Sequence, residues 1–255
     1  MRHLGYLVFI MACVLVWAAI MGIAHASTAP PTRQTCATQQ TYRYGPYRVD
    51  NDLFTGRRGP SCITVTGPSL TIDAAYQAQP GGVVAYPNIR YGPKFGSADD
   101  LAQLPLRVDD LGTLALHVRS SCQAAGHWIS DVDGWVYGSA GTRTPGIAEI
   151  VIGLCSQGWG EGGVRVKIGP RWYLAERHVT GGGAGWPLTT FRPLAPARRR
   201  VLPVGAFTRW MLHEGWLRPG EWLGNVAFGT ECWSGCQGLT DRLVVTGGVP
   251  RYRAP

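Results

Sequence analysis

Short runs in which apolar residues alternate with polar ones, or follow one another directly, recur along most of the chain between glycines and prolines. Alternation over roughly four to eight positions predicts a strand with one buried face, and glycine and proline predict the turns between strands. Such runs lie at 43–49, 61–66, 69–74, 82–87, 112–119, 132–138, 147–155, 163–168, 171–176, 222–230 and 242–247. Many short strands at fairly regular spacing predict an all-β fold, either a β-sandwich or a jelly roll.

One segment, 204–217, departs from this pattern. Val204, Phe207, Trp210 and Met211 recur there at helical spacing, and a proline directly precedes the segment. We therefore expect one short amphipathic helix packed on the outside of the sheet, with Trp210 and Met211 in the core.

The N-terminus has the pattern of a targeting segment. An apolar run at 4–23 follows a basic start, and a small-x-small pattern occupies 24–26. We expect a signal peptide at 1–26, a linker at 27–34 and one β-sandwich catalytic domain at 35–255. The apolar run is longer than is usual for a signal peptide, so an uncleaved anchor is the alternative and the only route to a membrane.

Six cysteines follow the apolar run, and an even number in an exported chain predicts disulfides. Cys232 and Cys236 are close enough to close a small loop, Cys36 with Cys62 would tie the first strand to the next, and Cys122 with Cys155 are left by elimination. A zinc site is the alternative use, but the spacings lack paired CxxC motifs, so we expect no metal.

The net charge of +8 comes almost entirely from arginine. A basic surface can meet nucleic acid, anionic lipid or an acidic polymer of the cell wall. No basic helix or basic stripe interleaved with aromatic residues is present, so we expect no nucleic-acid partner. We interpret the densest run, 198–200, as a solvated loop.

Two predicted strands each carry one glutamate among apolar or small residues. Glu149 lies on the face of its strand opposite Ile150 and Ile152, and Glu231 shares a face with Ala227. A charge within such a strand needs solvent or a partner, and small neighbours leave room for a substrate. Each glutamate alone could be a half-exposed strand residue or part of a salt bridge. Together they would supply the carboxyl pair that glycoside hydrolysis requires.

Seven segments recur in an order that is typical of one family. They are Asn51-Asp52-Leu53-Phe54, Cys62-Ile63-Thr64-Val65, the stretch 81–92 with Tyr86-Pro87-Asn88-Ile89, Leu104-Pro105-Leu106, Asp133-Gly134-Trp135, Glu149-Ile150-Val151-Ile152, and Gly229-Thr230-Glu231-Cys232-Trp233 followed by Gly238-Leu239. In this order they resemble glycoside hydrolase family 12, a family of small endoglucanases and xyloglucanases. The resemblance runs from about Cys36 to Val249.

The resemblance implies a jelly-roll β-sandwich of two antiparallel sheets with a cleft across the concave one. It also implies cleavage of β-1,4-glucan with retention at the anomeric carbon. Glu149 would be the nucleophile and Glu231 the acid/base. Asp133 would be a third carboxylate that shares a proton with the nucleophile, although by sequence alone it could equally be a turn residue. We expect a secreted monomer that needs no cofactor and acts on a β-glucan polysaccharide such as cellulose, mixed-linkage glucan or xyloglucan.

Aromatic rings stack on the C–H faces of sugars, and polar groups at the edges bind the hydroxyls. The candidates for substrate binding are Asn51, Phe54, Tyr86, Trp135 and Trp233. Three more tryptophans, Trp128, Trp159 and Trp186, are weaker candidates that we interpret as structural.

The chain departs from the family pattern at Gly153 and Phe54, where tryptophan is usual, and at Val151, where methionine is usual. We therefore expect a wider cleft that grips glucose less tightly. These departures leave open a glycan-binding or wall-associated protein with impaired catalysis. The third hypothesis is a basic exported protein that binds an anionic wall polymer.

Overall fold

The structure of the chain is a computed structural model. It describes residues 30–37, 40–54, 61–79, 82–93, 104–140, 146–160, 162–180 and 185–246. The expected signal peptide lies outside these residues. No helix among them is long and apolar enough to cross a membrane.

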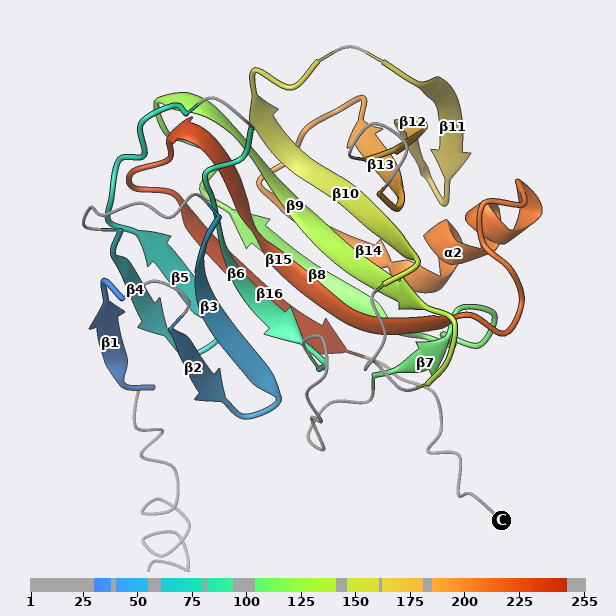
Figure 1. The fold of residues 1–255 in the computed structure, drawn as a ribbon, viewed down its shortest axis with the longest axis horizontal. Coiled ribbons are helices and arrows are strands. Elements are labelled where there is room, and N and C mark those ends of the chain that lie inside the picture. Colours follow the sequence, from blue (N-terminus) through green and yellow to red (C-terminus); the bar gives the residue numbers. More distant parts are fainter. Residues whose placement is uncertain are drawn as a thin grey trace, which may run out of the picture. The chain divides into compact units, whose positions relative to one another are not determined.

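The larger of two sheets contains the long central strands of the fold (Figure 1). Its order is β11 (Val164–Ile168), β12 (Arg171–Val179), β13 (Pro187–Pro193), β10 (Ala148–Gln157), β9 (Gly126–Tyr137), β15 (Trp222–Gly235), β6 (Ala85–Tyr91), β3 (Tyr47–Leu53) and β2 (Thr41–Tyr44), with β7 (Leu106–Arg107) paired to β15. Neighbouring strands are antiparallel except β10 and β13, which are parallel. This one pair departs from the expected antiparallel arrangement, because a crossover through β11 and β12 brings β13 back beside β10 in the same direction.

The smaller sheet packs against one face of the larger one. Its order is β1 (Thr32–Thr35), β4 (Ile63–Thr66), β5 (Ser69–Ile72), β16 (Thr240–Thr246), β8 (Ala115–Ser120) and β14 (Arg199–Pro203). The predicted all-β sandwich is thus confirmed. β1 begins at Thr32, so the last three residues of the expected linker belong to a strand that pairs with β4. β14 begins at Arg199, so the arginine run interpreted as a loop enters a strand instead.

Alternation along the strands separates the core from the open face of the larger sheet. On β10, Ile150 and Ile152 are buried between the sheets, and Glu149 points to the other side. On β15, Val226 and Phe228 join the same core. The open face of the larger sheet is left free for a cleft.

One helix, α2 (Val204–His213), is present in the described residues and is shorter than the predicted 204–217. Its Phe207 packs edge-on against Phe191 of β13, with ring centroids 5.1 Å apart. Met211 is fully buried and Trp210 is partly buried against Phe191, as expected for core residues. The helix therefore covers the part of the larger sheet around β12 and β13.

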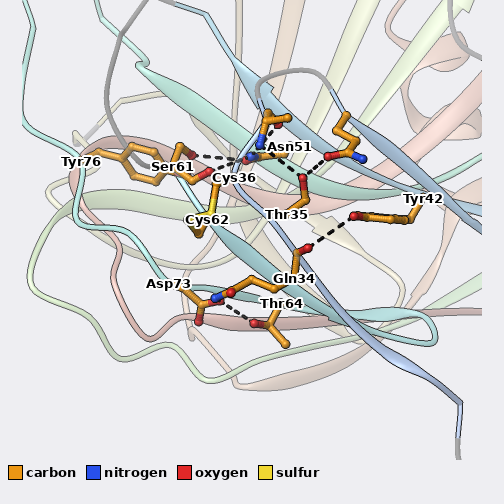
Figure 2. The surroundings of a disulfide bond; sticks show 12 residues. Gln34, Thr35, Cys36, Tyr42, Asn51, Ser61, Cys62, Thr64, Asp73 and Tyr76 are labelled. Carbon is orange, nitrogen blue, oxygen red and sulfur yellow. Dashed lines mark hydrogen bonds between the residues drawn. A yellow bond between two sulfur atoms is a disulfide. The ribbon is translucent and has the colours of Figure 1, made fainter.

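The three expected cysteine pairs are all at disulfide distance. The bonds join Cys36 to Cys62, Cys122 to Cys155 and Cys232 to Cys236. The first links the end of β1 to the residue before β4, as Figure 2 shows. The third spans the end of β15, from Cys232 within the strand to Cys236 directly after it.

Candidate active site

A cleft of about 420 Å³ lies on the open face of the larger sheet. It crosses β3, β6, β15, β9 and β10 and reaches Trp186, the residue before β13. Its lining residues are Asp52, Leu53, Phe54, Tyr86, Asn88, Arg90, Asp133, Trp135, Glu149, Trp186, Asn225, Ala227 and Glu231. The cleft therefore brings together the three carboxyl residues predicted from the sequence, Glu149, Glu231 and Asp133.

Glu149 is held by a neighbour that sequence reasoning had interpreted as structural. Nε1 of Trp186 donates a 2.5 Å hydrogen bond to Oε2 of Glu149. Burial raises the pKa of Glu149, while this hydrogen bond and the charge of His178 act in the opposite direction. The indole bond thus stabilises the charged form of the carboxyl group, which is the form a nucleophile needs.

Glu231 has the environment of a proton donor. Burial, and then the nearby charge of Glu149, raises its pKa to about 7. Near neutral pH this carboxyl group therefore holds a proton for a large part of the time. The cleft thus holds one carboxyl group with an indole donor that favours its charged form and one whose pKa is about 7, and such a pair can act as nucleophile and acid.

Asp133 lies in the cleft beside both glutamates. Its Oδ2 accepts a 3.0 Å hydrogen bond from Nε1 of Trp135, and its Oδ1 has no hydrogen-bond partner within the described residues. Burial, followed by the charges of Glu149 and Glu231, raises the pKa of Asp133 well above its usual value. Burial and the two neighbouring charges therefore favour the protonated form of Asp133.

A fourth carboxyl group, Asp131, was not predicted as a site residue. It lies two positions before Asp133 on the same face of β9 and is fully buried. Burial, then the charges of Glu231 and Asp133, raises the pKa of Asp131 well above its usual value. The sequence repeat Asp131-x-Asp133-x-Trp135 could have predicted Asp131 as a site residue, because alternation places all three side chains on one face of the strand.

Aromatic rings line the cleft as expected. Phe54 is exposed at 57% of its surface, and the rings of Trp135 and Trp186 pack together with centroids 5.1 Å apart. Tyr86 is almost buried, and its hydroxyl donates a 3.3 Å hydrogen bond to the carbonyl oxygen of Ala227. Phe54, Trp135 and Trp186 therefore offer flat surfaces to a ligand, while Tyr86 forms part of the floor.

Asn51 was predicted to bind substrate, and the structure places it elsewhere. It shares the core-facing side of β3 with Val49 and Leu53 and is fully buried. Its side-chain amide donates to the carbonyl oxygens of Ala37 and Ser61, at 3.2 and 3.0 Å. Figure 2 shows these bonds beside the disulfide between Cys36 and Cys62. Asn51 therefore fixes the N-terminal corner of the fold and cannot reach the cleft.

Trp233 was also predicted to bind substrate, but it does not line the cleft. Its ring stacks on His127 of β9, with centroids 4.6 Å apart and planes 15° apart. A shift of register between Cys232 and Ser234 occurs at this point of β15. Because of this irregularity the ring of Trp233, two residues after Glu231, lies against β9 and not in the cleft.

The expected gap beside Gly153 is filled. A Cβ atom at Gly153 would lie 2.4 Å from Cζ3 of Trp159 and 3.3 Å from Cδ of Pro193. The indole of Trp159 thus occupies the space that a side chain at position 153 would take. Gly229 likewise does not open room for substrate, because a Cβ there would lie 2.2 Å from the carbonyl oxygen of Pro87.

Polar residues that sequence reasoning missed complete the cleft. They are Asp52, Asn88, Arg90 and Asn225. Asn88 donates to Oδ2 of Asp52 at 3.4 Å, and its Oδ1 has no partner among the described residues. Arg90 forms a buried ion pair with Asp50 at 2.7 Å. In the described residues, no group of three or more His, Cys, Asp or Glu is arranged to hold a metal ion.

The fold and the site define a class: a two-sheet jelly roll whose open face carries a cleft lined by carboxyl groups and aromatic rings. Solved structures with the same fold belong to glycoside hydrolase family 12, so the resemblance read from the motifs is confirmed at the level of the fold. No protein-family model and no curated protein matches the chain.

Three of the solved structures show how far the similarity extends. A metagenome-derived family 12 endoglucanase is 24% identical, with a TM-score of 0.78 over 87% of this chain and 100% of that one. An endoglucanase from Rhodothermus marinus is 25% identical, with a TM-score of 0.76 over 84% and 98%. A family 12 xyloglucanase from Bacillus licheniformis is 20% identical, with a TM-score of 0.73 over 84% and 99%.

Proposed function

We propose that this chain is a secreted, endo-acting glycoside hydrolase that cleaves β-1,4-glucan by double displacement with retention of configuration. The observation that carries the proposal is the pairing of Glu149 and Glu231 in one cleft, where the charge of the first helps to raise the pKa of the second to about 7. Endoglucanases and xyloglucanases among the structural neighbours support the same class of substrate.

In the first step the carboxylate of Glu149 attacks the anomeric carbon. The bond from that carbon to the leaving oxygen breaks, and Glu231 gives its proton to that oxygen. The products are a shortened glucan with a free hydroxyl and a glycosyl ester on Glu149. The hydrogen bond from Trp186 favours the charged form of the attacking carboxylate and fixes its orientation.

In the second step water attacks the same carbon, Glu231 takes a proton from the water, and Glu149 leaves. Two inversions restore the original configuration. Because the charge of Glu149 helps to raise the pKa of Glu231, forming the ester lowers that pKa. Glu231 is therefore an acid in the first step and a base in the second.

Asp133 acts as a positioning residue in this scheme. Trp135 holds one of its oxygens, and the other faces no protein donor or acceptor in the described residues. The raised pKa of Asp133 favours its protonated form, which reduces the repulsion between like charges beside Glu149 and Glu231. Burial favours the protonated form of Asp131 in the same way.

The apolar rings and polar edges of the cleft suit a neutral sugar chain. Phe54, Trp135 and Trp186 present ring faces, while Asn88 and Asp52 offer hydrogen-bonding groups. The position of the cleft across several strands suits a chain that enters and leaves at both ends, as endo-cleavage requires. The three disulfides support an oxidising, extracellular location.

The first test is hydrolysis by the purified mature protein of carboxymethylcellulose, mixed-linkage glucan and xyloglucan. Glu149→Gln should lose at least about a thousandfold in turnover on the polymer that the parent cleaves, because it removes the nucleophile. Glu214→Gln, which changes an exposed glutamate at the end of α2, should keep full activity. Polymer binding without release of reducing ends by the parent protein would instead support a glycan-binding protein.

The second test separates the two glutamates by the acidity of the leaving group. Glu231→Ala should be strongly impaired on polymer and far less impaired in the first step on an aryl cellobioside, whose phenolate needs little protonation. With Glu149→Ala, added azide should form a glycosyl azide of α configuration. Inversion of configuration by the parent enzyme, followed by NMR during hydrolysis, would refute the double displacement.

A further inference from the structure

Three arginines form a row across the outer face of the smaller sheet. Arg119 of β8 lies directly opposite Arg242 of β16 on one side and directly opposite Arg199 of β14 on the other. All three side chains are exposed. They line a groove of about 320 Å³ together with His117 and Val201. Neighbouring strands are about 4.8 Å apart, so the row repeats a positive charge at this interval.

Among the described residues, no negative charge is paired with this row. No ion pair within the described residues involves Arg119, Arg199 or Arg242. The nearest carboxyl group along the chain, Asp241, points to the buried side of β16 and accepts a hydrogen bond from Thr230. Like charges placed directly opposite on neighbouring strands destabilise a sheet. An anion laid along the row would remove this repulsion.

The neighbours of the row restrict the kind of anion. Guanidinium groups pair with carboxylates through two parallel hydrogen bonds. The rest of the groove is lined by His117, the buried Arg200, Thr246 and three valines, of which Val201 is exposed at 53% of its surface. No phenyl, phenol or indole ring lines the groove, and binding of single-stranded nucleic acid relies on such rings for base stacking. The open row suits a linear polymer better than a single small anion.

We propose that this face binds a linear polysaccharide of sugar acids, with successive carboxylates paired to Arg199, Arg119 and Arg242. The face lies on the side of the sandwich away from the cleft, since the cleft occupies the outer face of the other sheet. An acidic polysaccharide can therefore be held while the cleft is free. The inference does not depend on the reaction proposed for the cleft.

The test measures retardation of the full mature protein in gels that contain polygalacturonate, at several salt concentrations. One variant combines Arg119→Gln, Arg199→Gln and Arg242→Gln. The matched control removes the same charge elsewhere through Arg171→Gln, Arg209→Gln and Arg218→Gln, which change exposed arginines away from the row. The row variant should bind at least about tenfold more weakly, whereas the control should change little.

Three further measurements decide the outcome. Fully methyl-esterified polygalacturonate should not bind, and binding to the free acid should weaken steeply with salt. The row variant should unfold at the same temperature as the parent or at a higher one, because it relieves like-charge repulsion.

Equal losses in both triple variants, or equal binding of the ester, would overturn the proposal. Equal or tighter binding of oligothymidylate that depends on the same arginines would replace it with a nucleic-acid surface.

Discussion

The indole nitrogen of Trp186 donates a 2.5 Å hydrogen bond to Oε2 of Glu149, which ties the segment before β13 to the carboxylate on β10. A hydrogen bond to a charged group contributes about 1.5–3 kcal/mol. It favours the ionised carboxylate and opposes the effect of burial on its pKa. The bond thus couples the orientation of one cleft residue to the charge of another.

Trp186→Phe tests this coupling. The phenyl ring keeps an aromatic surface beside Trp135 but donates no hydrogen bond, so the pKa of Glu149 should rise. We expect kcat/KM to fall about tenfold or more and its acidic limb to move to higher pH. The measurement is kcat/KM against pH. Trp172→Phe, at an exposed tryptophan outside the cleft, is the control, and an unchanged acidic limb in Trp186→Phe would contradict the coupling.

The pKa of Glu231 gives a second prediction. Because the acid must be protonated, kcat/KM should fall as the pH rises above about 7. In Glu149→Gln the neighbouring charge is absent, so the pKa of Glu231 should be lower than in the parent. Titration of the side-chain carboxyl carbon by NMR measures both values. If Glu214→Gln shifted the titration as much as Glu149→Gln does, the pKa would not depend on the pair.

The contact between Gly153 and Trp159 leads to a third prediction. Gly153→Ala places a methyl group 2.4 Å from Cζ3 of the indole, so the ring must move. Overpacking of this kind costs about 1–3 kcal/mol of the free energy of unfolding. Combining it with Trp159→Ala should cost less than the sum of the single changes, because the clash is then absent. Urea unfolding of the four proteins measures the coupling, and strict additivity would show that the two positions do not compete for space.

Strand alternation in the sequence was sufficient to place the catalytic candidates. Alternation puts Glu149 and Glu231 on the faces of β10 and β15 opposite the core residues Ile150 and Phe228, and the structure brings both glutamates into the cleft. The same rule, applied to Val49-x-Asn51-x-Leu53, places Asn51 with two core residues. The prediction that Asn51 binds substrate rested on the motif resemblance and not on alternation, and it was wrong for that reason.

Other features of the site and the fold could not be predicted from the local sequence pattern. Trp186 and Trp159 lie outside the strands, and they meet Glu149 and Gly153 only through tertiary contacts. The parallel pairing of β10 and β13 likewise depends on how the chain returns after β12. Periodicity describes one strand at a time, so it predicts which face a residue takes but not which loop covers that face.

Asp241 gives a prediction about stability. It is fully buried between the sheets, where a chain of hydroxyl groups from Ser120 through Ser130 to Thr230 ends in a 2.7 Å hydrogen bond to its Oδ2. Burial is the main cause that raises its pKa to about 6. A carboxyl group with a raised pKa in the folded state favours folding when protonated, so this contribution is complete below about pH 4 and is lost as the pH rises through about 6.

The difference from the usual pKa of an aspartate corresponds to about 3 kcal/mol at pH 8. Asp241→Asn carries no charge at any pH, so it should be more stable than the parent at pH 8 and lose this advantage at pH 4. Urea unfolding at both pH values measures the difference. Asp109→Asn is the control of opposite sign, because Arg107 lowers the pKa of that exposed carboxyl group. A gain for Asp241→Asn that was the same at pH 4 and pH 8 would mean that Asp241 is not the group whose ionisation opposes folding.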